Sequence, residues 1–156
     1  VRTFADLARL KAREPGLVIA PHAFYPASSC LRRQLDRHAD LFDAVEYNAM
    51  FTVSLNFNRL AVAWASARGK PMVGNGDVHR LRQLGTTWSL VDAPADADAI
   101  CAAIAAGRVR VDASPLAWRD AAGIMVDLLA WPPPAGRRIE TMPASGSTSI
   151  SLPQSA

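Results

Sequence analysis

Apolar residues recur along this chain in two patterns, short continuous runs and runs at helical spacing. The continuous run at 17–20 is typical of a strand buried on both faces, and similar runs follow at 42–47 and 71–75. Helical spacing predicts helices beginning near positions 3, 28, 54, 96 and 114, and two further short strands are expected at 86–91 and 109–111. This alternation of helices and strands indicates an α/β fold with parallel strands.

Capping residues suggest where several of these helices begin and end. Thr3 and Asp6 have the spacing of a capping box, in which each side chain binds the other residue's backbone N–H. Ser54 is expected to cap the third helix and Asp96 the fourth. Gly107 follows the fourth helix and is expected to end it.

The segment 72–79, Met-Val-Gly-Asn-Gly-Asp-Val-His, breaks an apolar run with two glycines and then presents Asp77 and His79. If the backbone stays extended there, the two side chains point to the same side. A carboxylate and an imidazole together suit Zn, Mn or Fe. Gly74 and Gly76 are expected to adopt backbone angles that other residues avoid, which allows a sharp turn and close approach to a ligand.

Polar side chains end three of the predicted strands. His22, Glu46 and the Asp77/His79 pair each lie at or just after the C-terminal end of a different strand. Barrels and open α/β sheets place their sites at this end of the strands. The sequence therefore predicts a shared metal or phosphate site there.

Composition sets broad limits on the protein. Its 156 residues are half hydrophobic and one fifth charged, enough for one soluble domain, predicted at 1–131. The net charge of +3 argues only faintly for an anionic ligand. Two distant cysteines outside any Cys-x-x-Cys pair favour a reducing, cytoplasmic location. No membrane span is expected, and residues 132–156, rich in Ser, Pro, Gly and Thr, are predicted to form a disordered tail.

Three motifs resemble the later motifs of the PHP superfamily, named for polymerase and histidinol phosphatase domains. They are Pro-His-Ala-Phe-Tyr-Pro at 21–26, Asp-Ala-Val-Glu-Tyr-Asn at 43–48 and Lys-Pro-Met-Val-Gly-Asn-Gly-Asp-Val-His at 70–79. The resemblance covers about residues 4–111. It implies a distorted (β/α)7 TIM-like barrel that holds two or three divalent metals and hydrolyses phosphoesters. It also implies that His22, Asp77 and His79 are metal ligands, with Asp77 and His79 at the catalytic centre.

The chain departs from the family in its first part. PHP members normally open with a His-x-His strand and further Asp, His and Glu ligands, whereas the histidines here are His22, His38 and His79. Gly76 also stands where the family usually has Ser. Four or five strand units are too few for an eight-unit barrel, so the chain is expected to form either a small open sheet or a barrel that lacks its first part, and the resemblance favours the partial barrel. The missing metal ligands would come from an N-terminal segment or from a second chain.

Other side chains near these motifs are candidates for substrate binding. Arg80 and Arg82 directly follow the last motif, and a guanidinium group matches phosphate with two parallel hydrogen bonds. Glu46 and Asn48 lie at a strand end beside the predicted site and are assigned to the same role. Cys30 is not expected to be a nucleophile, because no histidine pairs with it in the sequence.

Two functions remain open from the sequence. The first is a metal-dependent phosphoesterase that uses metal-activated water on a small phosphorylated metabolite or nucleotide. The second is a catalytically incomplete PHP remnant that serves as a binding or scaffold module. The absent opening motif favours the second for this chain alone, and the motifs that are present favour the first for a longer parent. Nucleic-acid binding is weaker, because no recognised motif or basic stripe is present.

Overall fold

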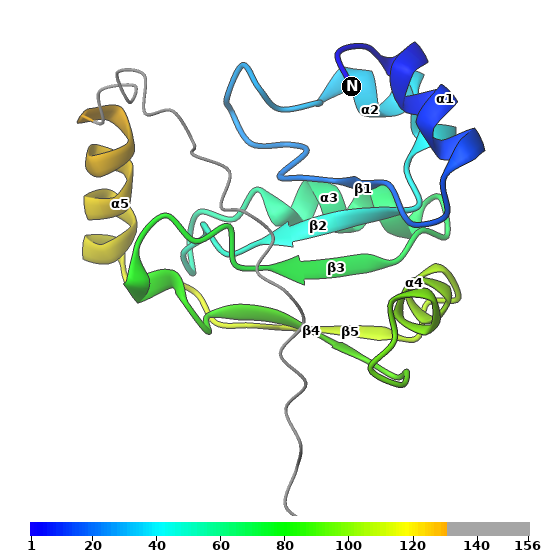
Figure 1. Ribbon diagram of the computed structural model, residues 1–156. Coiled ribbons are helices and arrows are strands. Elements are labelled where there is room, and N and C mark those ends of the chain that lie inside the picture. Colours follow the sequence, from blue (N-terminus) through cyan, green and yellow to red (C-terminus); the bar gives the residue numbers. More distant parts are fainter. Residues whose placement is uncertain (131–156) are drawn as a thin grey trace, which may run out of the picture.

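The computed structural model describes residues 1–130, with three parallel strands forming the central sheet (Figure 1). The strands are β1 (Ile19–Ala20), β2 (Ala44–Asn48) and β3 (Met72–Asn75), in the order β1-β2-β3. β2 and β3 pair over four positions, from Val45 opposite Met72 to Asn48 opposite Asn75. Since parallel strands end at the same edge of a sheet, the segments that follow all three strands meet there.

Two further strands, β4 (Thr87–Val91) and β5 (Val109–Ala113), pair with each other in antiparallel orientation. The prediction of parallel strands is therefore right for the first three strands and wrong for these two. The intervening helix, α4 (Ala97–Ala105), lies beyond one end of the pair, so β5 runs back along β4 (Figure 1). Residues 1–130 do not form a closed barrel, and the TIM-like barrel is not confirmed.

Two of the predicted caps are confirmed. α1 (Phe4–Arg13) begins with a capping box, in which the Thr3 hydroxyl accepts the Asp6 N–H at 3.1 Å and Asp6 accepts the Thr3 N–H at 3.0 Å. At α4, the Asp96 side chain accepts the Ala99 N–H at 2.9 Å. Both caps use residues within one helical turn, which is why sequence spacing was sufficient to find them.

The prediction that Ser54 caps the third helix is wrong. α3 (Asn58–Ser66) begins four residues later, and its N-cap residue, Phe57, provides no side-chain cap. The Ser54 hydroxyl instead accepts a hydrogen bond from the indole N–H of Trp118 at 3.0 Å. Trp118 is distant in the sequence, so a tertiary contact replaces the predicted local one.

The helix predicted from position 28 is much shorter than expected. It consists of α2 (Arg33–Arg37) and a 3-10 turn, η1 (Ala39–Leu41), with Arg32 in a left-handed conformation (φ 47°) directly before α2. This conformation stops the helix from extending toward Ser28. His38 is stacked on Phe4, with ring centroids 3.9 Å apart.

The core lies between the sheet and its helices, with α3 covering one face of β2 and β3 (Figure 1). Buried residues come from every layer, including Leu35 of α2, Val45 of β2 and Trp64 of α3. The last helix, α5 (Trp118–Ala130), lies at the end of the sheet toward which β2 and β3 point (Figure 1). It starts after position 114 because the Ser114 N–H still bonds the Thr86 carbonyl and so extends the β4–β5 pair.

None of the helices within residues 1–130 is long and apolar enough to cross a membrane. The predicted disordered tail, 132–156, lies outside the described residues.

The capping box of α1 is expected to lose its stabilising effect in acid. Hydrogen bonds from Arg9 and from the N–H groups of Arg2 and Thr3 hold the pKa of Asp6 at about 2, below the ordinary 3.8. A carboxyl group with a lowered pKa stabilises the folded state above its unfolded pKa, and this contribution disappears as the pH falls toward about 2. Asp6→Asn should therefore lower the melting temperature at about pH 6 and lower it less at about pH 3. An effect of equal size at both pH values would contradict this prediction.

Candidate functional site

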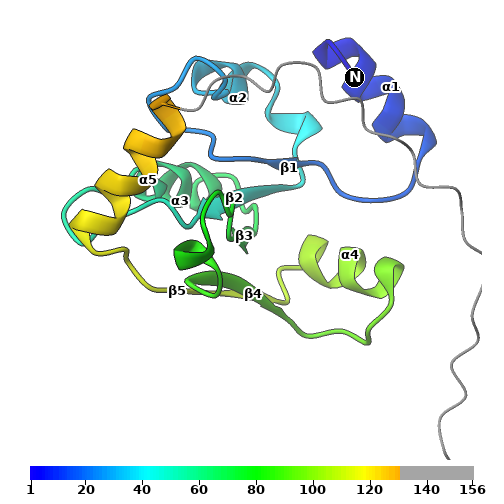
Figure 2. The same ribbon diagram turned by 60° about the vertical axis from the view of Figure 1, so that its left-hand side comes forward.

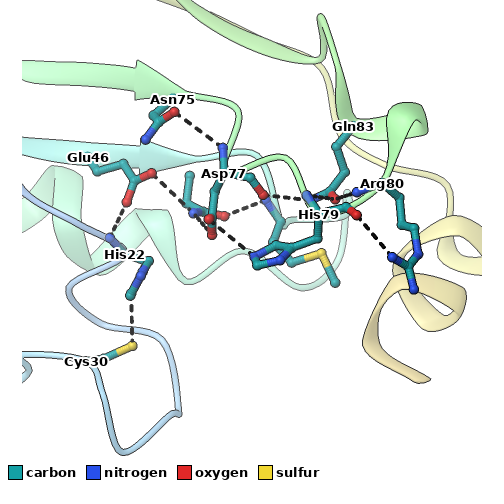
Figure 3. A network of polar contacts seen from close by, with 10 residues as sticks. His22, Cys30, Glu46, Asn75, Asp77, His79, Arg80 and Gln83 are labelled. Carbon is teal, nitrogen blue, oxygen red and sulfur yellow. Dashed lines mark hydrogen bonds and ion pairs between the residues drawn. The ribbon is translucent and has the colours of Figure 1, made fainter. Parts of the chain in front are cut away.

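Four predicted site residues gather where the three parallel strands end (Figure 3). His22 follows β1, Glu46 lies in β2, and Asp77 and His79 follow β3. The Glu46 carboxylate accepts a short hydrogen bond from the His22 backbone N–H, and Asp77 Oδ1 lies 3.3 Å from His79 Nε2. The structure thus brings these residues to one edge of the sheet, as the strand positions predicted.

Asp77 and His79 meet through a turn rather than through an extended strand. β3 ends at Asn75, and Asp77 has a φ of 39°, a left-handed conformation that is uncommon for residues other than glycine. The Asn75 side chain accepts the Asp77 N–H at 3.3 Å, and the buried Gln83 side chain accepts the His79 N–H at 2.9 Å. These two contacts hold the turn that brings the carboxylate to the imidazole.

The predicted role of the two glycines is only partly right. Neither Gly74 nor Gly76 has a positive φ, so the expectation of unusual backbone angles there is wrong. Gly74 does allow a close approach, but to protein: a Cβ at this position would lie 2.5 Å from the Trp88 carbonyl oxygen of β4. The Ser89 hydroxyl also donates to the Gly74 carbonyl at 3.0 Å. Gly74 therefore serves the contact between β3 and β4.

Glu46 and Asn48 are almost fully buried, at 2% and 1% exposure. Burial raises the pKa of Glu46, and the negative charge of Asp77 acts in the same direction, against a smaller lowering by the His22 N–H. The Glu46 carboxyl therefore keeps its proton to a higher pH than a solvated glutamate does. Glu46 is therefore a buried member of the hydrogen-bond network that connects the strand ends.

Asn48 connects the two carboxylates of the site. Its side-chain N–H₂ group donates to Asp77 Oδ2 at 2.9 Å and to Glu46 Oε1 at 3.3 Å, while its Oδ1 accepts the Met50 N–H at 2.7 Å. The side chain of Asn58, 1% exposed, bonds both the N–H and the carbonyl of Asn48 at 2.9 Å. This role of Asn58 could not be predicted from the sequence, since an asparagine at the start of a helix looks like an ordinary cap.

His22 also contacts a cysteine that the sequence did not connect with it. The His22 Nδ1 atom lies 3.2 Å from Cys30 Sγ, and both side chains are partly buried (Figure 3). The loop between them closes through the Arg32 N–H, which donates to the Ala23 carbonyl at 2.8 Å. His22 itself has a left-handed backbone (φ 26°). This contact depends on the shape of the loop, so residue spacing did not indicate it.

Arg80 and Arg82 both reach α5. Arg80 Nε lies 2.7 Å from Asp127, and Arg82 lies 3.4 Å from Asp120. The hydrogen bond from Arg80 lowers the pKa of Asp127. The predicted role of these arginines in phosphate binding stays a prediction. In this structure they attach α5 to the segment that follows Asp77 and His79.

A pocket of about 330 Å³ opens at this end of the sheet. It is lined mainly by His22, Tyr25, Cys30, Asn48, Met50, Asp77, His79, Met125 and Leu128. Two of these residues belong to α5, which Figure 2 shows beside the loops at the strand ends. We name this cavity the polar pocket, because the predicted ligands and Asn48 form one side of it.

The side chains around the polar pocket suit a divalent metal in kind but not in number. An imidazole and a carboxylate are in contact, and a second imidazole, from His22, lines the same cavity. Within residues 1–130, however, no group of three or more His, Cys, Asp or Glu side chains is placed to hold a metal ion. The described residues fit part of a metal site and do not complete one.

The comparison with known families identifies the region that contains Asp77 and His79. A family model described as PHP-associated matches residues 56–109, about a third of the chain, from the loop before α3 to the start of β5. The match is consistent with the predicted resemblance to the C-terminal part of the PHP superfamily. No curated protein matches the chain.

Proposed function

We propose that this chain supplies the C-terminal part of a PHP-type, metal-dependent phosphoesterase site that acts on a small phosphorylated metabolite or nucleotide. The observation that carries the proposal is the contact between Asp77 and His79 inside the PHP-associated region. His22 lines the same pocket from a neighbouring strand end, which supports a shared role. His22, Asp77 and His79 would be ligands for Zn, Mn or Fe, and the remaining ligands would come from outside the described residues, in a further segment or a second chain.

Two buried residues, Asn48 and Glu46, hold these ligands in place. Asn48 binds Asp77 Oδ2 and leaves Oδ1 directed at His79, while Glu46 holds the backbone of His22. Preorganised side chains of this kind lose little freedom when a ligand binds. A bound divalent metal would lower the pKa of a water molecule toward neutrality and neutralise phosphoryl oxygens. Arg80 and Arg82 remain the proposed phosphate contacts, which would require their pairs with α5 to open.

Metal titration of the purified chain tests this proposal directly. Isothermal calorimetry with Zn²⁺ and Mn²⁺ should show a site that weakens by about tenfold or more in Asp77→Asn, which replaces a charged oxygen ligand with a neutral one, and in His79→Ala, which removes a nitrogen ligand. His38→Ala is the matched control, since His38 stacks on Phe4 of α1 and does not line the polar pocket. It should leave metal binding unchanged.

Equal loss of binding in His38→Ala, or equal binding in all variants, would contradict the proposal. Hydrolysis of p-nitrophenyl phosphate is a second, separate measurement, made on the metal-loaded wild type and on the same variants. Activity that depends on Asp77 and His79 would support the phosphoesterase, and activity that survives both substitutions would exclude these residues from the reaction.

A second candidate function is a binding module without hydrolytic activity. The observation that favours it is Asn48, whose side-chain amide donates a hydrogen bond to each of the two carboxylates. In that case the chain should bind phosphate esters with the same affinity in the presence and absence of a chelator. The titration and the hydrolysis assay together separate the two functions.

A further inference from the structure

A second pocket, of about 230 Å³, lies beside the polar pocket and has almost no polar side chains in its wall. It is lined by Tyr25, Pro26, Met50, Phe51, Thr52, Leu55, Phe57, Trp118, Ala121, Ala122 and Met125. The Tyr25 hydroxyl donates to the Met50 carbonyl at 2.7 Å, and the Tyr25 and Phe57 rings pack with centroids 5.3 Å apart. We name this cavity the apolar pocket.

The two pockets are adjacent and share part of their walls. Tyr25, Met50 and Met125 line both of them, so a ligand that extends past these three side chains would occupy both cavities. At one end it would meet His22, Asp77 and His79, and at the other the aromatic and aliphatic wall between the 50–57 segment and α5. The polar pocket carries imidazole, carboxylate and amide groups on one side, whereas the apolar pocket exposes almost no polar surface.

The apolar wall is partly exposed in the free protein. Trp118 is 57% exposed, and Leu55 and Met125 are each 46% exposed. Covering these side chains with an apolar group would bury surface that water now contacts, which is favourable. A sugar hydroxyl placed against the same wall would lose its hydrogen bonds to water without gaining a partner.

We propose that the ligand of this site is an amphiphilic phosphoester, whose phosphate lies in the polar pocket and whose aromatic or aliphatic group lies in the apolar pocket. This inference rests on the proposed function for the phosphate end only. The apolar end rests on the wall formed by Phe57, Trp118 and Met125. Highly polar esters, such as sugar phosphates, would be poor ligands for the same physical reason.

Three probes separate the contributions of the two ends: 1-naphthyl phosphate, 1-naphthol and inorganic phosphate, each titrated by calorimetry into the full chain with Mn²⁺ present. Naphthyl phosphate should bind at least about tenfold more tightly than inorganic phosphate, because the ring buries apolar surface. Ala121→Phe places a bulky side chain on the wall of the apolar pocket and should remove this advantage. Val126→Phe is the matched control, since Val126 is a 63% exposed position of the same helix and is not among the lining residues.

Ala122→Phe provides a second filling variant at an exposed position of the apolar pocket, and thermal melting verifies that each variant is folded. Equal affinity for naphthyl phosphate and inorganic phosphate, or an advantage that survives both filling variants, would overturn the proposal. Failure of the proposed function has a different signature. In that case 1-naphthol still binds to the wild type and no longer binds to the two filling variants. The metal titration then shows no dependence on Asp77 or His79.

Discussion

Replacing Asn48 with alanine is expected to lower the free energy of unfolding by about 3 kcal/mol. Asn48 is 1% exposed, and its side chain serves three partners: the carboxylates of Glu46 and Asp77 and the Met50 N–H. Removing the amide leaves the buried Glu46 carboxyl and the Met50 N–H without that partner, whereas Asp77, whose side chain is 34% exposed, can bond water instead. Unsatisfied buried polar groups, charged ones above all, cost more than the net value of the hydrogen bond that is lost.

Chemical denaturation of the wild type and of Asn48→Ala would measure this loss. Asn75→Ala is the matched control, because Asn75 pairs with Asn48 in the sheet register but is exposed and makes only a 3.3 Å bond to the Asp77 N–H. The control should cost about 0.5 kcal/mol or less. If the two variants lost the same stability, the network around Asn48 would not have the importance that the contacts indicate.

Gly74→Ala is expected to destabilise the protein by about 2–3 kcal/mol. The new Cβ would lie 2.5 Å from the Trp88 carbonyl oxygen, 2.8 Å from its carbonyl carbon and 3.0 Å from a methyl group of Val111. Two of these three atoms belong to the backbone of β4, which cannot move without disturbing its pairing with β5. β3 and β4 would have to separate locally.

Thermal and chemical unfolding of Gly74→Ala should be compared with Gly76→Ala. At Gly76 the added Cβ would meet only a methyl group of Val78, at 2.8 Å, and this side chain is 46% exposed, so it has room to change its χ1 rotamer. Gly76→Ala should therefore cost clearly less than Gly74→Ala. Equal losses would show that β3 and β4 have room to adjust, and that Gly74 is not required by their close contact.

The positions of the elements and of the candidate ligands follow from local properties of the chain. Thr3 and Asp96 cap their helices through residues one turn away, so their spacing was sufficient evidence. The apolar runs located β2 and β3, and the rule that parallel strands end at one edge placed Glu46 and Asp77 together. The PHP-associated match covers the same Asp77 and His79 motif.

Contacts between residues distant in the sequence decided the remaining features. Ser54 bonds Trp118, and Arg80 pairs with Asp127, 47 residues away; these contacts position α5 beside the polar pocket. β4 and β5 pair in antiparallel orientation because α4 lies beyond one end of the strands, which periodicity does not record.

The amino-acid sequence by itself determined which residues stand at the strand ends, since strand and helix propensity act over a few neighbouring residues. Tertiary structure alone decided how those residues are held: Asn58 bonds the backbone of Asn48, and the Asn48 amide connects Glu46 with Asp77. It also placed the apolar pocket against the polar one through Tyr25. The physical reason is that burial and hydrogen bonding depend on which distant segments pack together, and this packing is settled only when the whole domain folds.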